Sequence, residues 1–193
     1  QDKVRQIEEY YAQCELEGAN EHQVEESQKA VAKMEVIIGD PDRLRAVAED
    51  FIKHYETRVA EGATVAGKAM FVCSNRNIAY DFYKIVKELR PEWTEKKICD
   101  DGVVLSEKDK KELKPMEKIK LVMTRNKDDE KDLFDMLGTK EDRKEFDRQF
   151  KNPKSNFKIA IVVDMWLTGF DVPELDTIYI DKPIQQHTLI QTI

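Results

Sequence analysis

The sequence predicts an α/β protein in which a mostly parallel sheet carries helices on both faces and is preceded by an α-helical segment. Four apolar runs, 68–73, 120–123, 159–163 and 177–180, are too short for ordinary helices and predict strands. Amphipathic stretches with helical periodicity separate the first three of these runs. Strands that alternate with helices favour right-handed crossovers, and therefore a parallel sheet.

The composition is that of a charge-rich globular chain. Its 193 residues are 37% charged and 40% hydrophobic, enough for one sizeable domain with an appendage. No apolar run is long enough to span a bilayer, and the N-terminal region is too charged for a signal peptide. Cys14, Cys73 and Cys99 are far apart and have no metal-ligand spacing. We therefore expect a reduced, cytoplasmic protein without a structural metal site.

The net charge of −7 is unevenly distributed along the chain. Residues 1–61 carry 15 acidic and 8 basic side chains, whereas residues 62–193 carry 24 of each. An acidic chain is unlike a simple basic DNA-binding module, although it is compatible with a motor domain that shares a DNA groove with other domains. The change in composition predicts a boundary between a helical lead-in or linker region, 1–61, and an α/β domain, 62–193.

Residues 1–61 are expected to be helical throughout. Apolar residues recur at helical intervals of three, four or seven along three stretches: Val4, Ile7, Tyr11 and Cys14; Val24, Val31, Met34 and Ile38; Leu44, Val47, Phe51 and Tyr55. Gly39 is expected to end the second helix, and Asp40 and Pro41 to begin the third as its N-cap and first helical residue. We expect this region to pack on the following domain rather than to act independently.

Polar residues follow the first predicted strand. The segment Gly62–Gly67 predicts a flexible linker, and strand 68–73 leads into Ser74, Asn75 and Arg76. A helix follows and ends at Pro91, and its apolar face holds Ile78, Phe82, Ile85 and Leu89. Unpaired N–H groups and the helix dipole attract anions to such a helix start. The three polar residues are therefore candidates for a phosphate site, although Ser74 or Asn75 could equally be the helix N-cap.

The middle of the chain holds a second candidate strand end. Strand 120–123 ends next to Thr124, Arg125 and Asn126, which are further candidates for phosphate contact. Residues 91–115 indicate no function, and Val103–Leu105 could form a short strand. The acidic run 128–132 could be taken for a Mg²⁺-binding ATPase motif. A polar loop separates it from the strand, so the preferred interpretation is the acidic first turn of a helix carrying Leu133, Phe134 and Leu137.

Another helix is expected before the third strand. Gly138 should end the preceding helix, and Thr139–Asp142 should begin the next one with a capping box. Phe146 and Phe150 are its expected core residues.

The stretch from Ile159 to Pro183 carries the most specific pattern. A strand buried on both faces ends at Asp164, and a polar loop and a second strand follow. The loop contains Thr168, Gly169, Asp171 and Pro173. Open α/β sheets place ligand-binding groups in loops of this kind, at the carboxyl ends of strands.

This loop resembles motif V of superfamily 2 helicases and translocases, in which a strand precedes Thr/Arg-Gly-x-Asp and then Val-Pro. Residues 164–173, DMWLTGFDVP, are similar to the motor (R) subunit of type I restriction enzymes, and residues 187–191, HTLIQ, resemble the start of motif VI. The resemblance covers residues 68–193. It implies a fragment with the second RecA-like domain of such a motor, ending before the two motif VI arginines.

The resemblance also implies roles for individual residues. Ser74, Asn75 and Arg76 would belong to motif IV and, with Thr124 and Thr168, would meet the DNA backbone. Three residues, Gly169, Asp171 and Gln191, would lie at the nucleotide. The backbone N–H of Gly169 would also suit a phosphate of the DNA. Thr168 could instead be a turn hydroxyl and Asp171 a loop cap, and Trp166 and Phe170 are expected to be packing residues.

In that family ATP and Mg²⁺ lie between two RecA-like domains, and the whole subunit is an ATP-dependent type I site-specific deoxyribonuclease. This sequence has no Gly-x-x-x-x-Gly-Lys-Ser/Thr cradle, so the fragment alone is expected to be inactive and to hold neither ATP nor Mg²⁺. The implied partners are double-stranded DNA, the first RecA-like domain and the nuclease domain of the same chain, and the methylation and specificity subunits; no membrane is expected. Two alternatives are another superfamily 2 helicase or remodeller and a non-enzymatic α/β interaction module.

Overall fold

The computed structural model describes residues 21–163 and 175–182. The chain divides into two compact units, Gln1–Asp40 and Pro41–Ile193. In the first unit, helix α2 runs from Glu21 to Ile38 and stops just before Gly39, as predicted. The described helices are neither long nor apolar enough to cross a membrane.

The second unit contains most of the described secondary structure. Its described elements are α3 (Pro41–Ala60), β1 (Lys68–Cys73), α4 (Arg76–Leu89), the short 3-10 helix η1 (Pro91–Thr94), α5 (Glu107–Glu112), β2 (Ile119–Val122), α6 (Lys131–Leu137), α7 (Lys140–Lys151), β3 (Ile159–Val163) and β4 (Leu175–Asp181).

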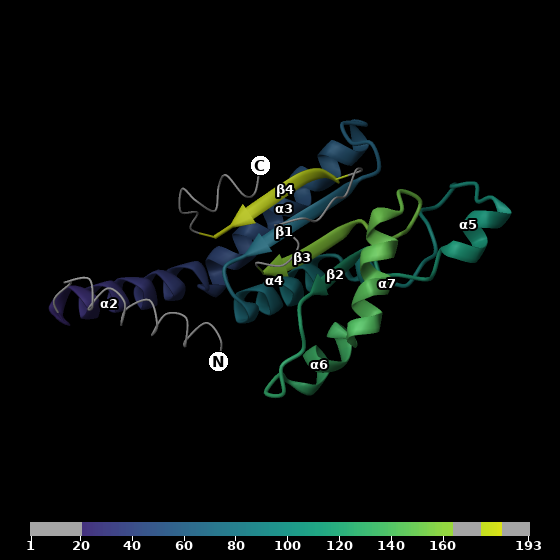
Figure 1. Cartoon of the computed structure of the whole chain (residues 1–193). Coiled ribbons are helices and arrows are strands. Elements are labelled where there is room, and N and C mark those ends of the chain that lie inside the picture. The colour runs from purple at the N-terminus through teal and green to yellow at the C-terminus, as the bar shows by residue number, and fades with distance from the viewer. Residues whose placement is uncertain (1–20, 164–174, 183–193) are drawn as a thin grey trace. The chain divides into compact units, whose positions relative to one another are not determined.

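The four strands form one sheet in the order β2-β3-β1-β4, and every neighbouring pair is parallel. Their carboxyl ends therefore lie at the same edge of the sheet (Figure 1). Every residue of β1, β2 and β3 is buried, whereas β4 is partly exposed. Burial on both faces explains why the first three strands read as continuous apolar runs. The predicted α/β class is confirmed.

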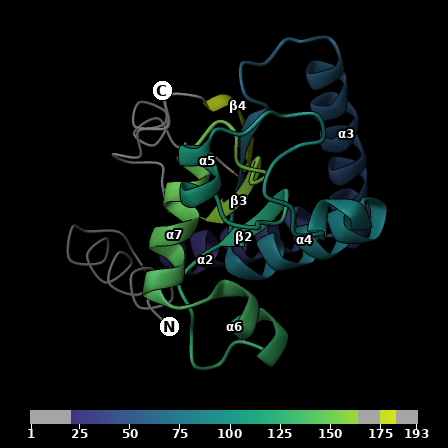
Figure 2. The ribbon, with the colours of Figure 1, turned by 90° about the vertical axis from the view of Figure 1, so that its right-hand side faces the viewer.

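Helices α3 and α4 cover one face of the sheet (Figure 2). The contact is aromatic: the ring of Phe71 from β1 stacks on Phe82 from α4, with 3.9 Å between centroids. Phe51 from α3 lies 5.1 Å from the Phe71 centroid and 5.8 Å from that of Phe82. Aromatic rings contribute large apolar areas to a core, so α3 is an integral part of this unit.

Helix α7 covers the opposite face (Figure 2). Because side chains alternate along a strand, the neighbours of Phe71 in β1 point to this second side. The buried residues of this core are Met70, Val72, Met116, Val122, Phe150, Phe157, Ala160 and Val162. Phe150 of α7 is buried and Phe146 packs against the cluster, which confirms both as core residues. The sheet thus has helices on both faces, as predicted.

Local signals for the helix ends are confirmed in two places. Gly138 ends α6 with φ 66°, a conformation that favours glycine, and a Cβ there would lie 2.7 Å from the Cβ of Asp142. Thr139 and Asp142 form the predicted capping box at the start of α7. The prediction of a strand at Val103–Leu105 is wrong. These residues form no regular element, and the nearby β-bridge instead joins Lys97 to Met116.

The predicted flexible linker before β1 is tied to the edge strand β4. The carboxylate of Asp176 accepts hydrogen bonds from the backbone N–H groups of Val65 (2.7 Å), Ala66 (3.3 Å) and Lys68 (3.1 Å). The Tyr55 hydroxyl of α3 donates to the carbonyl oxygen of Gly67 at 2.8 Å. These bonds hold the connection between α3 and β1 in one conformation. The proposed division near residue 62 stays a prediction, and a truncation that tests it is described below.

Candidate nucleic-acid interface at the carboxyl edge of the sheet

The carboxyl edge of the sheet gathers the described residues that the sequence singles out. β1 ends next to Ser74, β2 ends shortly before Thr124, and both strands flank β3. β3 ends at Val163, the last described residue before the motif V-like loop. The strand order therefore places the end of β3 between two candidate phosphate contacts.

Ser74 and Asn75 shape the turn from β1 into α4. The Ser74 hydroxyl donates to the carbonyl oxygen of Asp181 at 3.1 Å, joining the ends of β1 and β4. Asn75 is the N-cap of α4, and its side-chain oxygen accepts from the Ile78 N–H at 3.0 Å. The structure therefore confirms the capping interpretation for Asn75. Capping uses only the side-chain oxygen of Asn75. Its amide nitrogen is a donor, and no described residue accepts a hydrogen bond from it.

Arg76 reaches from α4 to the end of β2. Its Nη1 donates to the carbonyl oxygen of Thr124 at 2.6 Å, and its Nη2 lies 2.7 Å from both carboxylate oxygens of Asp129. The Asp129 side chain is only 7% exposed and also accepts from the Asn126 N–H at 2.7 Å. Because β3 lies between β1 and β2, this ion pair ties together the two strand ends that flank the end of β3.

The acidic run 128–132 is divided between two roles. Asp129 lies in the loop before α6 and pairs with Arg76. The helix begins at Lys131, with Asp132 in its first turn and with Leu133 and Leu137 buried. The predicted acidic first turn is thus confirmed for Asp132, whereas sequence reasoning missed the contact of Asp129. No group of three or more potential metal ligands occurs among the described side chains, those of this run included.

The neighbouring residue Arg125 presents a different environment. Its guanidinium carbon lies 4.2 Å from the centroid of the Phe134 ring of α6, and its Nε is buried without a hydrogen-bond partner in the described part of the chain. Thr124, immediately before it, is exposed. This end of β2 therefore offers a hydroxyl and a guanidinium next to each other.

At the other side of the edge, Asp181 at the end of β4 pairs with Arg43 of α3, and the Asp181 side chain is 12% exposed. Cys73 is the last residue of β1 and is buried. Burial raises the pKa of its thiol well above the usual range. A buried, protonated thiol is a poor nucleophile, so Cys73 is a core residue.

Four of the predicted site residues, Thr168, Gly169, Asp171 and Gln191, lie outside the described residues. Their assignment to DNA or nucleotide stays a prediction. Of the others, the structure brings Ser74, Asn75, Arg76 and Thr124 to one edge.

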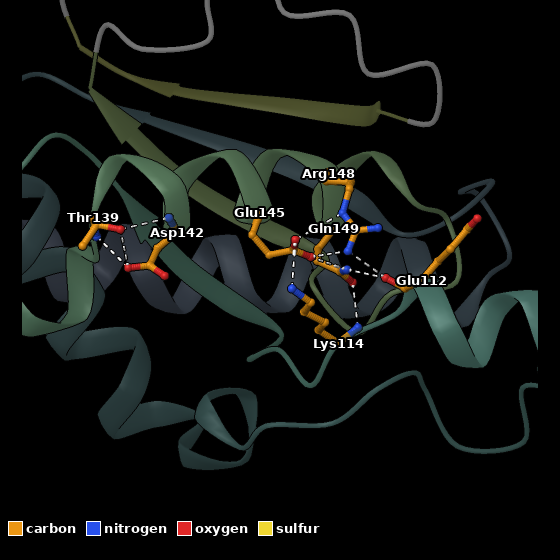
Figure 3. A network of polar contacts seen from close by, with 7 residues as sticks. All are labelled: Glu112, Lys114, Thr139, Asp142, Glu145, Arg148 and Gln149. Atoms are coloured by element: carbon orange, nitrogen blue, oxygen red, sulfur yellow. Dashed lines mark hydrogen bonds and ion pairs between the residues drawn. The ribbon is translucent and has the colours of Figure 1, made fainter.

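A second polar network fixes the α5 segment on α7, and Figure 3 shows its members. The side-chain amide of Gln149, 1% exposed, donates to the Glu112 carbonyl oxygen at 2.9 Å and to Glu145 at 2.7 Å, and it accepts from the Lys114 N–H at 3.3 Å. Arg148 also donates to the Glu112 carbonyl oxygen, at 3.0 Å. Burial raises the pKa of Glu145, but Arg148, Gln149 and Lys114 outweigh it and hold that pKa below its usual range. All these contacts are structural.

The parallel sheet with helices on both faces and polar groups at its carboxyl edge is consistent with a RecA-like α/β fold. The chain belongs to the family of the type I restriction enzyme subunit R domain 3, whose family model matches residues 65–193.

Comparison with curated proteins gives the same family. The chain is 35% identical over 169 residues to the type I restriction enzyme HindI endonuclease subunit of Haemophilus influenzae, covering 88% of this chain and 14% of that protein. It is 37% identical over 177 residues to the putative type I restriction enzyme MjaIXP endonuclease subunit of Methanocaldococcus jannaschii, covering 91% of this chain and 14% of the relative. A shorter match, 47% identical over 51 residues, covers 24% of this chain and 6% of the SauCOLORF180P endonuclease subunit of Staphylococcus aureus. The chain thus spans about a seventh of the length of the first two relatives.

Proposed function

We propose that this chain is part of the ATP-dependent, DNA-translocating motor of a type I restriction enzyme R subunit. It contributes DNA-backbone contacts from the carboxyl edge of its sheet and one wall of the ATP cleft. The observation that carries the proposal is the convergence of Ser74, Arg76 and Thr124 around the strand that leads into residues 164–174. Family membership favours an R subunit over other superfamily 2 enzymes and over a non-enzymatic module.

The chemistry of this edge suits a phosphate backbone. The donors near the edge of the sheet are the exposed hydroxyl of Thr124, the N–H groups at the start of α4 and the amide nitrogen of Asn75, which donates to no residue in the described part of the chain. Contacts of this kind fix a protein on the duplex without reading bases. A motor that moves along DNA of any sequence needs such contacts, and target choice then belongs to the specificity subunit of the proposed complex.

The described residues do not form a complete nucleotide site. They contain no cluster suited to Mg²⁺, and the sequence lacks a phosphate cradle. In the proposal, the cradle and the metal ligands come from the first RecA-like domain, and Gly169, Asp171 and Gln191 supply the contribution of this chain. DNA cleavage belongs to the nuclease domain of the same subunit, and the methylation subunit completes the complex.

The experiment that tests the proposal is Thr168→Ala in the complete R subunit, assembled with its partner subunits. Loss of one charge-assisted hydrogen bond to a phosphate, about 1–3 kcal/mol, should reduce DNA-stimulated ATPase and translocation velocity without lowering the unfolding midpoint.

The matched control is Thr94→Ala. The Thr94 hydroxyl donates to the Pro91 carbonyl oxygen, and η1 lies near the amino end of β2, where the Lys118 N–H donates to the Trp93 carbonyl oxygen. This control should keep wild-type coupling. Unchanged velocity and ATPase in the Thr168 variant would reject the role of the loop.

A further inference from the structure

Three arginines lie near the carboxyl edge of the sheet, and two of them have carboxylate partners. Arg43 pairs with Asp181, and Arg76 pairs with Asp129 through both carboxylate oxygens. The third, Arg125, forms no ion pair, and its guanidinium donates no hydrogen bond to any residue that the structure describes. Its charge is therefore the one of the three that remains available to an external anion.

The guanidinium of Arg125 is held in place without being neutralised. It stacks on the Phe134 ring at 4.2 Å, an arrangement that attracts a cation to the face of an aromatic ring and fixes the guanidinium plane. Its Nε is buried and has no hydrogen-bond partner among the described residues. Part of the free-energy cost of removing water from the guanidinium is therefore already met before an anion binds. Such a preorganised fork of donors matches the oxygens of a phosphate.

The Asp142 carboxylate interacts electrostatically with Arg125, but it already has other partners. It accepts from the Thr139 N–H at 2.7 Å and from the Thr139 hydroxyl at 2.8 Å. These bonds are the main reason why the pKa of Asp142 is lowered, and the charge of Arg125 adds a weaker, longer-range contribution. Asp142 therefore does not occupy the donors of Arg125.

We propose that Arg125 is a phosphate-binding cation of this edge, and that Arg76 is a positioning residue that holds Arg125 in place. Arg76 grips the carbonyl oxygen of Thr124, the residue directly before Arg125, and its partner Asp129 grips the Asn126 N–H directly after it. The Arg76–Asp129 pair thus clamps the backbone on both sides of Arg125. The ligand is a phosphate of the DNA backbone, and the inference rests on the proposed function of the edge.

The test measures the affinity of the complete R subunit, within its complex, for duplex DNA that lacks a recognition sequence. Titrations at salt concentrations from about 50 to 200 mM give the slope of log K against log[salt]. This slope is negative, and its magnitude decreases by about 0.9 for each phosphate contact that is lost. Arg125→Gln should weaken binding by about 3- to 10-fold and reduce the slope by about 0.9, equally for unrelated sequences. Arg125→Lys keeps the charge and should keep the slope.

The matched control is Arg148→Gln on α7, which removes an arginine charge paired with Glu145 and should leave the slope unchanged. The role of Arg76 is tested with Asp129→Asn, which weakens the grip of residue 129 on Arg76 and on the Asn126 N–H but leaves every arginine charge in place. If the pair positions Arg125, the folded variant should bind DNA more weakly than wild type. If Arg76 itself touched the phosphate, removal of its counter-charge would instead strengthen binding.

The outcomes separate this inference from the function on which it rests. A wild-type salt slope for a folded Arg125→Gln variant overturns the role of Arg125, while reduced coupling in Thr168→Ala still supports a DNA-contacting edge. If both variants behave as wild type, the proposed function fails together with the inference. A reduced slope for Arg125→Gln together with unchanged or stronger DNA binding by Asp129→Asn overturns the positioning role of Arg76.

Discussion

Individual side chains at the carboxyl edge are held by partners that lie far away in the sequence. Arg76 meets Asp129, and Asp181 meets both Arg43 and the Ser74 hydroxyl. Each contact joins a strand end to another element, so the edge has a defined arrangement before any ligand binds. A preorganised edge loses less conformational freedom on binding DNA.

Removing the charge of Asp129 tests this arrangement at the level of one residue. In Asp129→Asn, the partly buried Arg76 loses its counter-charge, and we expect the free energy of unfolding to fall by about 1–3 kcal/mol. Urea denaturation midpoints of the chain measure the effect. Asp128→Asn, an exposed neighbour, is the matched control and should change the midpoint little. Equal midpoints for the two variants would contradict the structural role of the pair.

At the scale of elements, short helices depend on contacts that the rest of the unit supplies. Helix α5 has six residues, none of them buried. A helix of this length is unstable alone. Its Ser106–Asp109 capping box satisfies its first N–H groups, and Gln149 of α7 holds its end through the Glu112 carbonyl oxygen. The position of α5 is therefore decided by α7.

Gln149→Met should release the end of α5 from α7. The variant keeps a side chain of similar size but removes the hydrogen bonds to Glu112 and Glu145 and the acceptor of the Lys114 N–H, at a cost of about 1–3 kcal/mol. Arg148 still donates to the Glu112 carbonyl oxygen, so the loosening should be local. Hydrogen exchange should then speed up in residues 107–114 more than in β1. A uniform change across the unit would argue against a local clamp.

The cap of α5 also predicts a dependence on pH. The Lys154 ammonium, and then the Ser106 N–H and hydroxyl, lower the pKa of Asp109 to about 2. Because the folded pKa is below the unfolded value of about 3.9, the stabilisation is present above that value and is lost as pH falls towards 2.

Asp109→Asn should therefore lower the urea midpoint at pH values above about 5, and the difference from wild type should shrink steadily down to about pH 2. Asp101→Asn, in a side chain that is 96% exposed, is the control and should show no such pH dependence. A difference between wild type and Asp109→Asn that is the same at every pH would rule out the charge as its cause.

At the scale of the whole molecule, the unit that begins at Pro41 needs α3. This helix buries Leu44, Ala48, Phe51, Ile52 and Tyr55, and it supplies Arg43 to the carboxyl edge. Burying one large apolar side chain contributes about 1.5–3 kcal/mol, and domains of this size are stable by only about 5–15 kcal/mol in total. The sheet face beneath α3 is thus not expected to stay folded without it.

Two truncations test this expectation. A chain of residues 41–193 should unfold cooperatively with a thermal midpoint close to that of residues 1–193, whereas a chain of residues 62–193 should lose cooperative unfolding in near-UV circular dichroism. If the shorter chain unfolds as cooperatively as the longer one, the boundary near residue 62 is correct and α3 is a separable lead-in.

Most elements follow from signals that span only a few residues. The apolar runs predict β1, β2, β3 and β4, the Thr139–Asp142 capping box predicts the start of α7, and Gly138 predicts the end of α6. Propensity, periodicity and capping act within one or two turns of backbone, so these features are encoded locally. The motif-like stretch 164–173 likewise indicates the family, whose model matches residues 65–193.

Only the tertiary structure decided the order β2-β3-β1-β4 and the contacts that depend on it. The sequence predicts Arg76 as a phosphate contact because it follows a strand at the start of a helix, whereas its actual partner Asp129 is 53 residues away. Asp176 ties down residues 65–68 from more than 100 residues away, so a segment that reads as a flexible linker becomes ordered. The physical reason is that such pairs form only when packing of the core has already closed the intervening loops, and no local pattern records which loop ends will meet.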